Sequence, residues 1–156
     1  MEACYNGINP TLGGVSMRYA ATEEIIAIRL SEGEELHPAL RHVCEEFNVD
    51  SAVVVGAVGM VRQVTFGWFN GQEYLKTDFD GVFELLALNG NVSIKDQALY
   101  PHLHAALSRP DHTTVGGHVL RAVADHNLEI FIKPLATVRL TRQFDGWFEA
   151  IVPVRR

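Results

Sequence analysis

The chain has 156 residues, of which 47% are hydrophobic and 21% are charged, and its formal net charge is −6 with histidine neutral. This length predicts one domain with a core large enough to fold without disulfides. The acidic balance disfavours a protein that holds nucleic acid through bulk charge, because phosphate binding needs a basic surface. No apolar run is long enough to cross a membrane, so we expect no membrane partner.

Residues 1–16 contain turn-forming pairs such as Asn6-Gly7 and Gly13-Gly14. We expect them to be a flexible extension in front of a domain at residues 17–156. They lack the basic start and apolar run of a secretory signal. Cys4 and Cys44 form no C-x-x-C pair, which is typical of a reduced, intracellular protein. We therefore expect a cytoplasmic protein with Cys44 buried on a helix.

The first regular elements are predicted before residue 50. The apolar run 25–30 indicates a strand within residues 18–30. Acidic residues follow Ser31 and favour a helix start, where the helix dipole stabilises negative charge. Apolar residues at helical spacing predict that this helix runs to about Asn48.

From residue 51 onward the apolar spacing changes to that of strands. Strands are expected at residues 51–59, 64–69, 73–77 and 83–88, on both sides of Arg109-Pro110-Asp111, and at 129–132, 137–141 and 147–154. The first of these is expected to close in a glycine bend, and the strand 83–88 to end at residues 89–91. One helix followed by many strands with short turns predicts an α+β domain with a mixed, largely antiparallel sheet.

Residues 100–119 carry the most informative pattern. His102 and His104 are two apart, so on a strand both side chains point to the same face. The turn is expected at residues 109–112, and a loop of three or four residues places His104 opposite His118 or Gly117. With the shorter loop, three imidazoles converge beside Gly116 and Gly117, which leave room for an ion or a ligand.

Three neutral imidazoles with an open fourth position are a recognised site for catalytic zinc. Imidazole also suits copper, nickel and iron, so the pattern predicts the ligands better than the metal. The alternative interpretation is that the histidines are ordinary, partly buried residues with hydrogen-bond partners. His112 is expected to be solvated in the turn, and His37, His42 and His126 lie on other predicted elements.

Other catalytic patterns are sparse. There is no dinucleotide or phosphate loop and no G-x-S-x-G nucleophile motif. Glu84 lies within an apolar strand and is the candidate general acid or base, since a buried glutamate must be paired, protonated or near a cation. Its alternative is a solvent-facing or ion-paired residue. Arg139, Arg142, Arg155 and Arg156 could form a basic patch or be spread over the surface.

Four stretches of the sequence resemble the plants-and-prokaryotes-conserved (PPC) domain. They are the opening at Met17–Tyr19, the stretch Gly81–Ser93 with its glycine-x-phenylalanine-glutamate start, the H-L-H strand at Pro101–Ser108, and the G-G-H strand at Val115–His118. The resemblance spans about residues 17–152.

This resemblance implies a mixed sheet with flanking helices, assembled as a homotrimer, and a fold similar to acetolactate decarboxylase. It also implies a metal, usually zinc, held by His102, His104 and His118. In plant members the domain follows an AT-hook that contacts DNA, and the stretch matching Gly81, Phe83, Glu84 and Leu85 contacts protein partners. An AT-hook core is absent from this sequence.

The leading hypothesis is a homotrimeric PPC-domain protein with a three-histidine, zinc-binding site and a regulatory or DNA-associated role. The alternative is a zinc-dependent enzyme that acts on a small carbonyl or ester substrate at the metal, with Glu84 as general acid or base. A third hypothesis gives the metal a purely structural role in the trimer.

Overall fold

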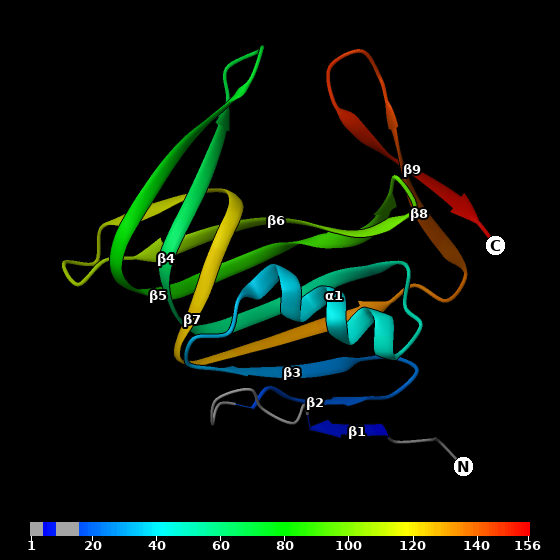
Figure 1. Ribbon diagram of the computed structural model, residues 1–156, viewed down its shortest axis with the longest axis horizontal. Coiled ribbons are helices and arrows are strands. Elements are labelled where there is room, and N and C mark those ends of the chain that lie inside the picture. The colour runs from blue at the N-terminus through cyan, green and yellow to red at the C-terminus, as the bar shows by residue number, and fades with distance from the viewer. Residues whose placement is uncertain (1–4, 9–15) are drawn as a thin grey trace.

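The computed structural model describes residues 5–8 and 16–156 (Figure 1). One helix and nine strands follow in the order β1 (Tyr5–Ile8), β2 (Arg18–Ala21), β3 (Ile26–Ser31), α1 (Leu36–Glu46), β4 (Ala52–Phe69), β5 (Tyr74–Lys95), β6 (Ala98–Ser108), β7 (Thr114–Pro134), β8 (Val138–Phe144) and β9 (Glu149–Arg155). Within this part of the chain, no helix is both long and apolar enough to pass through a bilayer.

The strands form one sheet in which four long, curved strands close on themselves. β4 pairs with β5 and β7, and β6 also pairs with both β5 and β7. β3, β2 and β1 extend the sheet beyond β7, and β8 joins β5 in parallel at Thr141. All other pairings are antiparallel, so the prediction of a mixed, largely antiparallel sheet is confirmed.

Helix α1 lies against one face of this sheet (Figure 1). The face of α1 that packs on the sheet is buried, as the helical spacing predicted, and includes Leu36, Leu40, Val43 and Cys44. Burial raises the pKa of the Cys44 thiol to about 12, so this cysteine is an inert core residue. The resemblance implies flanking helices, but α1 is the single helix in the described ranges 5–8 and 16–156.

Two glycine-rich stretches were predicted to end strands, and both predictions are wrong. β4 continues through Gly59 and β5 continues through residues 89–91. Gly59 and Gly90 have positive φ angles, and a Cβ on Gly90 would overlap the carbonyl oxygen of His102. These glycines let neighbouring backbones approach closely instead of turning the chain.

Part of the predicted flexible extension is described. Residues 5–8 form β1, which pairs antiparallel with β2 in the register Tyr5↔Ala21 to Ile8↔Arg18. Residues 1–4, including Cys4, and residues 9–15 lie outside the described residues. The flexibility of that segment therefore stays a prediction.

Candidate metal centre

The β6–β7 hairpin places the histidines. His104 pairs with His118, and the register continues to Ser108↔Thr114. The Arg109 amide donates to the Thr113 carbonyl at 2.9 Å, which leaves residues 110–112 as the loop. His112 takes the left-handed conformation that a three-residue hairpin loop needs. The shorter of the two predicted loops is therefore the one that forms.

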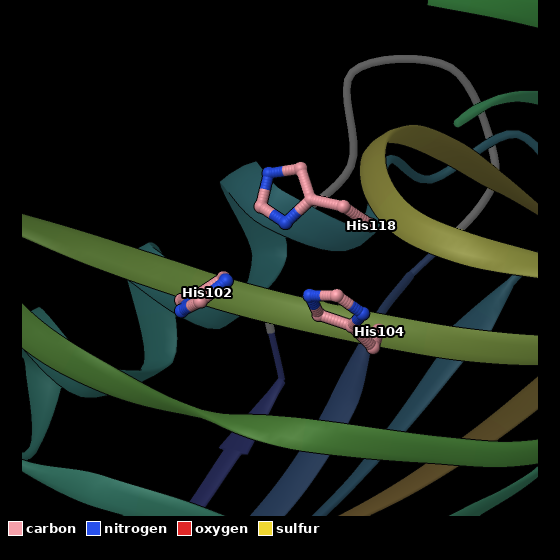
Figure 2. A group of neighbouring side chains, drawn as sticks. All are labelled: His102, His104 and His118. Carbon is pink, nitrogen blue, oxygen red and sulfur yellow. The ribbon is translucent and has the colours of Figure 1, made fainter. Parts of the chain in front are cut away.

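The three imidazoles of His102, His104 and His118 face one another (Figure 2). Their ring centroids lie 5.0–5.3 Å apart, and one ring nitrogen from each lies within 4.8 Å of the others. His118 is buried, His102 is partly buried and His104 is exposed. The cluster is therefore anchored in the protein on one side and open on the other, as a site with a free coordination position requires.

The electrostatics of this three-histidine cluster suit a metal ion. Nδ1 of His118 is buried and has no hydrogen-bond partner, an arrangement that costs free energy unless something binds the nitrogen. Burial, with nearby His104 and Arg142, lowers the pKa of His118. Burial and Arg142 lower the pKa of His102 to about 4. Both rings are therefore neutral near pH 7, which is the state that ligates metal.

Arg142 on β8 lies beside the cluster. Its Nη2 donates to Nδ1 of His102 at 3.1 Å and to Oδ1 of Asn91 at 3.1 Å, and its Nε donates to Oγ of Ser93 at 2.8 Å. Since a guanidinium can only donate, Nδ1 of His102 carries no proton here and the neutral ring carries its proton on Nε2.

The cluster lies in a cleft of about 1180 Å³. Its aromatic wall comes from the β4–β5 hairpin and the β8–β9 hairpin, which rise on the same side of the molecule (Figure 1). Phe69 from the first hairpin contacts Phe148 from the second, with ring centroids 4.6 Å apart. The ring of Tyr74 packs against the ring of His118, with the ring centroids 5.1 Å apart. A cleft of this kind offers apolar contacts to a small molecule that approaches the three histidines.

The other predicted site residues lie apart from the cluster. Glu84 is exposed and is not among the residues that line the cleft. In the predicted partner-binding stretch, Gly81 is also exposed, but Phe83 and Leu85 are buried in the core. The general acid or base role of Glu84 and the partner contacts of this stretch remain predictions.

Among the described residues, the remaining histidines are not part of the cluster. His112 is exposed in the loop, and His42 and His126 contact Glu46 and Asp125. His37 lies on α1, near enough to His118 for that ring to affect the pKa of His37. Burial, followed by Arg41 and His118, lowers the pKa of His37 to about 4.

Sequence reasoning missed the role of Arg142. The arginines near the C-terminus have different surroundings: Arg139 and Arg156 pair with Asp50, whereas Arg142 faces the cleft. Strand alternation held the signal, since Arg142 is two residues after Leu140, a buried core residue.

Comparisons with known proteins agree with this architecture. A family model of the Plants and Prokaryotes Conserved (PCC) domain matches residues 17–136. A plant- and prokaryote-conserved (PPC) protein from Pyrococcus horikoshii superimposes with a TM-score of 0.76 at 26% identity, over 91% of this chain and 96% of that one. A metal-containing protein from Archaeoglobus fulgidus superimposes with a TM-score of 0.74 at 25% identity, over 99% of this chain and 100% of that one.

A candidate DNA-binding protein from Bacteroides thetaiotaomicron gives a TM-score of 0.79 over 89% of this chain and 97% of that one. At 23% identity, this structural similarity shows a shared fold alone. A search of curated proteins gives no match. The implied similarity to acetolactate decarboxylase stays a prediction.

Proposed function

The chain belongs to the plants-and-prokaryotes-conserved domain family, and from this premise we propose that it is a metal-dependent protein whose three-histidine cluster holds one divalent ion, zinc in the first instance. We further propose that the ion serves chemistry on a small carbonyl or ester compound in the adjoining cleft. The observation that carries the proposal is the convergence of three ring nitrogens, one from each histidine, within 4.8 Å of one another.

A bound divalent ion would supply Lewis acidity that polarises a carbonyl or ester group. His102, His104 and His118 hold and orient it from two paired strands, so their relative positions are set by the sheet register. The aromatic wall would offer apolar contacts to the rest of the compound. Glu84 is exposed and does not line the cleft, so we propose no acid–base step through it at this site.

Elemental analysis tests the metal site. Protein purified without a nickel column, and then reloaded with zinc, should carry about one ion per chain. The His102→Ala/His104→Ala variant should carry none. The matched control is His112→Asn/His126→Asn, which removes two histidines outside the cluster and places asparagine where φ is positive. Equal metal content in all three proteins would overturn the proposal.

A turnover screen tests the enzymatic step. Zinc-loaded protein should convert at least one member of a panel of esters, lactones and keto acids, and the His102→Ala/His104→Ala variant should not. If a full complement of zinc gives no turnover with any compound, the metal serves binding or stability instead, and the enzymatic proposal fails.

We also propose that the protein is a homotrimer, as its family resemblance implies. An exposed apolar surface supports a subunit contact, since soluble monomers rarely leave such patches open. Val58 on β4, Val82 and Leu86 on β5, and Phe131 on β7 are 40–56% exposed. Light scattering coupled to gel filtration should give three times the chain mass, and Leu86→Glu should reduce it. A monomeric wild-type protein would contradict this.

A regulatory or DNA-associated role is the second candidate, as the family resemblance implies. Within the described residues, Arg139 and Arg156 are already paired with Asp50, and the chain is acidic overall. If the protein binds DNA directly, a plot of the logarithm of the binding constant against the logarithm of the salt concentration should have a slope of several units. Retardation of duplex DNA no greater than that by an unrelated acidic protein would remove direct DNA contact.

A further inference from the structure

The cleft beside the three-histidine cluster is positively charged, although the chain is not. Its lining includes the cations Lys95 and Arg142 and one acid, Glu149, whereas the whole chain has a formal charge of −6. A divalent ion on the histidines would add to this excess. Concave surfaces with one sign of charge concentrate ligands of the opposite sign.

Arg142 is the centre of this positive charge. It bonds to neutral acceptors: Oγ of Ser93, Oδ1 of Asn91, the backbone carbonyl of Glu149 at 2.9 Å, and Nδ1 of His102. No carboxylate forms an ion pair with it in the part of the chain that the structure describes. Arg142 is partly buried, so its charge is partly removed from water and would gain from an anion.

Both cations of the cleft, Lys95 and Arg142, lie over the aromatic ring of Tyr100. The guanidinium carbon of Arg142 lies 4.9 Å from the ring centroid of Tyr100, and Nζ of Lys95 lies 5.4 Å from it. Stacking on an aromatic ring fixes the plane of a guanidinium but does not neutralise its charge. Arg142 is therefore held in place by the protein with its charge still available.

The hydrogen bonds of Arg142 leave one of its donors available to an anion. A guanidinium has five N–H donors, and four are used in this arrangement, which leaves one on Nη1. That free N–H can donate to a carboxylate oxygen, and a hydrogen bond between two charged groups is stronger than one between neutral groups.

The remainder of the cleft suits a flat apolar body. Trp68 is 74% exposed and Trp147 is 69% exposed, one on each of the hairpins that form the aromatic wall. Phe144 and Phe148 on the β8–β9 hairpin are also exposed. Large aromatic side chains around a cleft offer apolar and stacking contacts to a ligand, and their exposure to water is unfavourable until such a ligand binds.

We propose that this cleft binds a small organic carboxylate with a flat apolar body, with the carboxylate at Arg142 beside the metal and the body between the two hairpins. The proposal rests on the proposed metal site, because a divalent ion there would add to the positive charge that attracts the carboxylate. It names the substrate class of that site by its chemistry.

Intrinsic fluorescence gives a direct test, since Trp68 and Trp147 are the two tryptophans of the chain and both line the cleft. Zinc-loaded protein is titrated with benzoate, with acetate and with benzyl alcohol. Benzoate should change the fluorescence saturably. The neutral alcohol should bind at least about tenfold more weakly than benzoate, as expected when a charged hydrogen-bond partner is lost. Acetate should also bind more weakly than benzoate, because it lacks the flat body.

Two arginine variants locate the site. Arg142→Gln should weaken benzoate binding about tenfold or more while it keeps about one zinc per chain. Arg139→Gln lies on the same strand but outside the cleft lining, and it should bind benzoate like the wild type. Removal of zinc from the wild-type protein should weaken benzoate binding as well.

The outcomes separate this proposal from the metal site on which it rests. Equal affinity for benzoate in Arg142→Gln and the wild type, or equal affinity for benzoate and benzyl alcohol, would overturn the carboxylate proposal and leave the metal site intact. Failure of the wild-type chain to take up zinc would overturn both.

Discussion

The β6–β7 hairpin and the β8–β9 hairpin both face the cleft, but they are held in different ways. β6 is paired with β5 along its whole length and with β7 from His104 onward, so His104 is held by strands on both sides and His102 by β5. β8 pairs with β9, but its strand contact to the body is at Thr141 alone. The metal ligands are thus set by the sheet. Arg142 and the part of the aromatic wall that comes from β8 and β9 stand on a less firmly held hairpin, which we call the β8–β9 arm.

This difference suits a division of work between the two regions. Metal ligands need fixed positions, which continuous strand pairing supplies. A surface that accepts an organic ligand gains from small adjustments, which a hairpin with few connections to the body permits. The family model ends at residue 136, before β8 begins at Val138, so the matched region contains the histidines and leaves out Arg142.

The largest effect is expected from a glycine that supports the rigid region. Gly90 has φ +152 and its Cα faces the carbonyl oxygen of His102, so Gly90→Ala introduces both strain and overlap. Unfolding by urea should show a loss of about 3 kcal/mol or more, with loss of metal binding. Gly117→Ala is the control, because its Cβ would meet Phe66 at an ordinary 3.4 Å. Similar losses in both variants would show that the close strand approach does not hold the site.

A smaller effect is expected where the arm joins the body. Ser51 is buried, and its Oγ accepts a hydrogen bond at 2.9 Å from the Leu140 amide on β8. Ser51→Ala leaves that amide without this partner and should cost about 1–2 kcal/mol of unfolding free energy. It should also weaken benzoate binding more than zinc binding. Ser31→Ala, which removes a part-buried hydroxyl far from the arm, serves as the control. A parallel loss of zinc and benzoate would contradict the separate anchoring of the two regions.

The acid sensitivity of the metal-free protein follows from its neutral histidines. Folding holds the pKa of His102 at about 4, below its ordinary 6.5, so the unfolded chain binds more protons in between. Stability is therefore complete above about pH 6.5 and declines as the pH falls toward 4. The melting temperature of the metal-free protein should drop over this range, and less in His102→Gln. An equal drop in both proteins would assign the acid sensitivity to His37 or other groups.

The smallest effect on stability is expected at the tip of the arm. Trp147 is largely exposed, so Trp147→Ala should change the unfolding free energy by no more than about 0.5 kcal/mol. The same change should weaken binding of benzoate but not of acetate, since it removes part of the apolar wall. A large loss of stability would mean that the arm supports the fold.

The same two regions show what the sequence could and could not predict. The β6–β7 hairpin follows from local rules, because a short loop and strand alternation fix which residues face each other. The courses of β4 and β5 were mispredicted because glycines at a close backbone approach have the same sequence signal as glycines at a turn. Arg142 reaches His102 across 40 positions of the sequence, and such a contact depends on how the arm packs against β5.

The most direct test of the account is zinc K-edge X-ray absorption on the loaded wild-type protein. The account predicts a first shell of nitrogen and oxygen at about 2.0–2.1 Å, with the outer-shell scattering of three imidazoles, and with that signature reduced in His118→Ala. A shell that contains sulfur, or one of oxygen atoms without imidazole scattering, would contradict the claim that His102, His104 and His118 hold the metal.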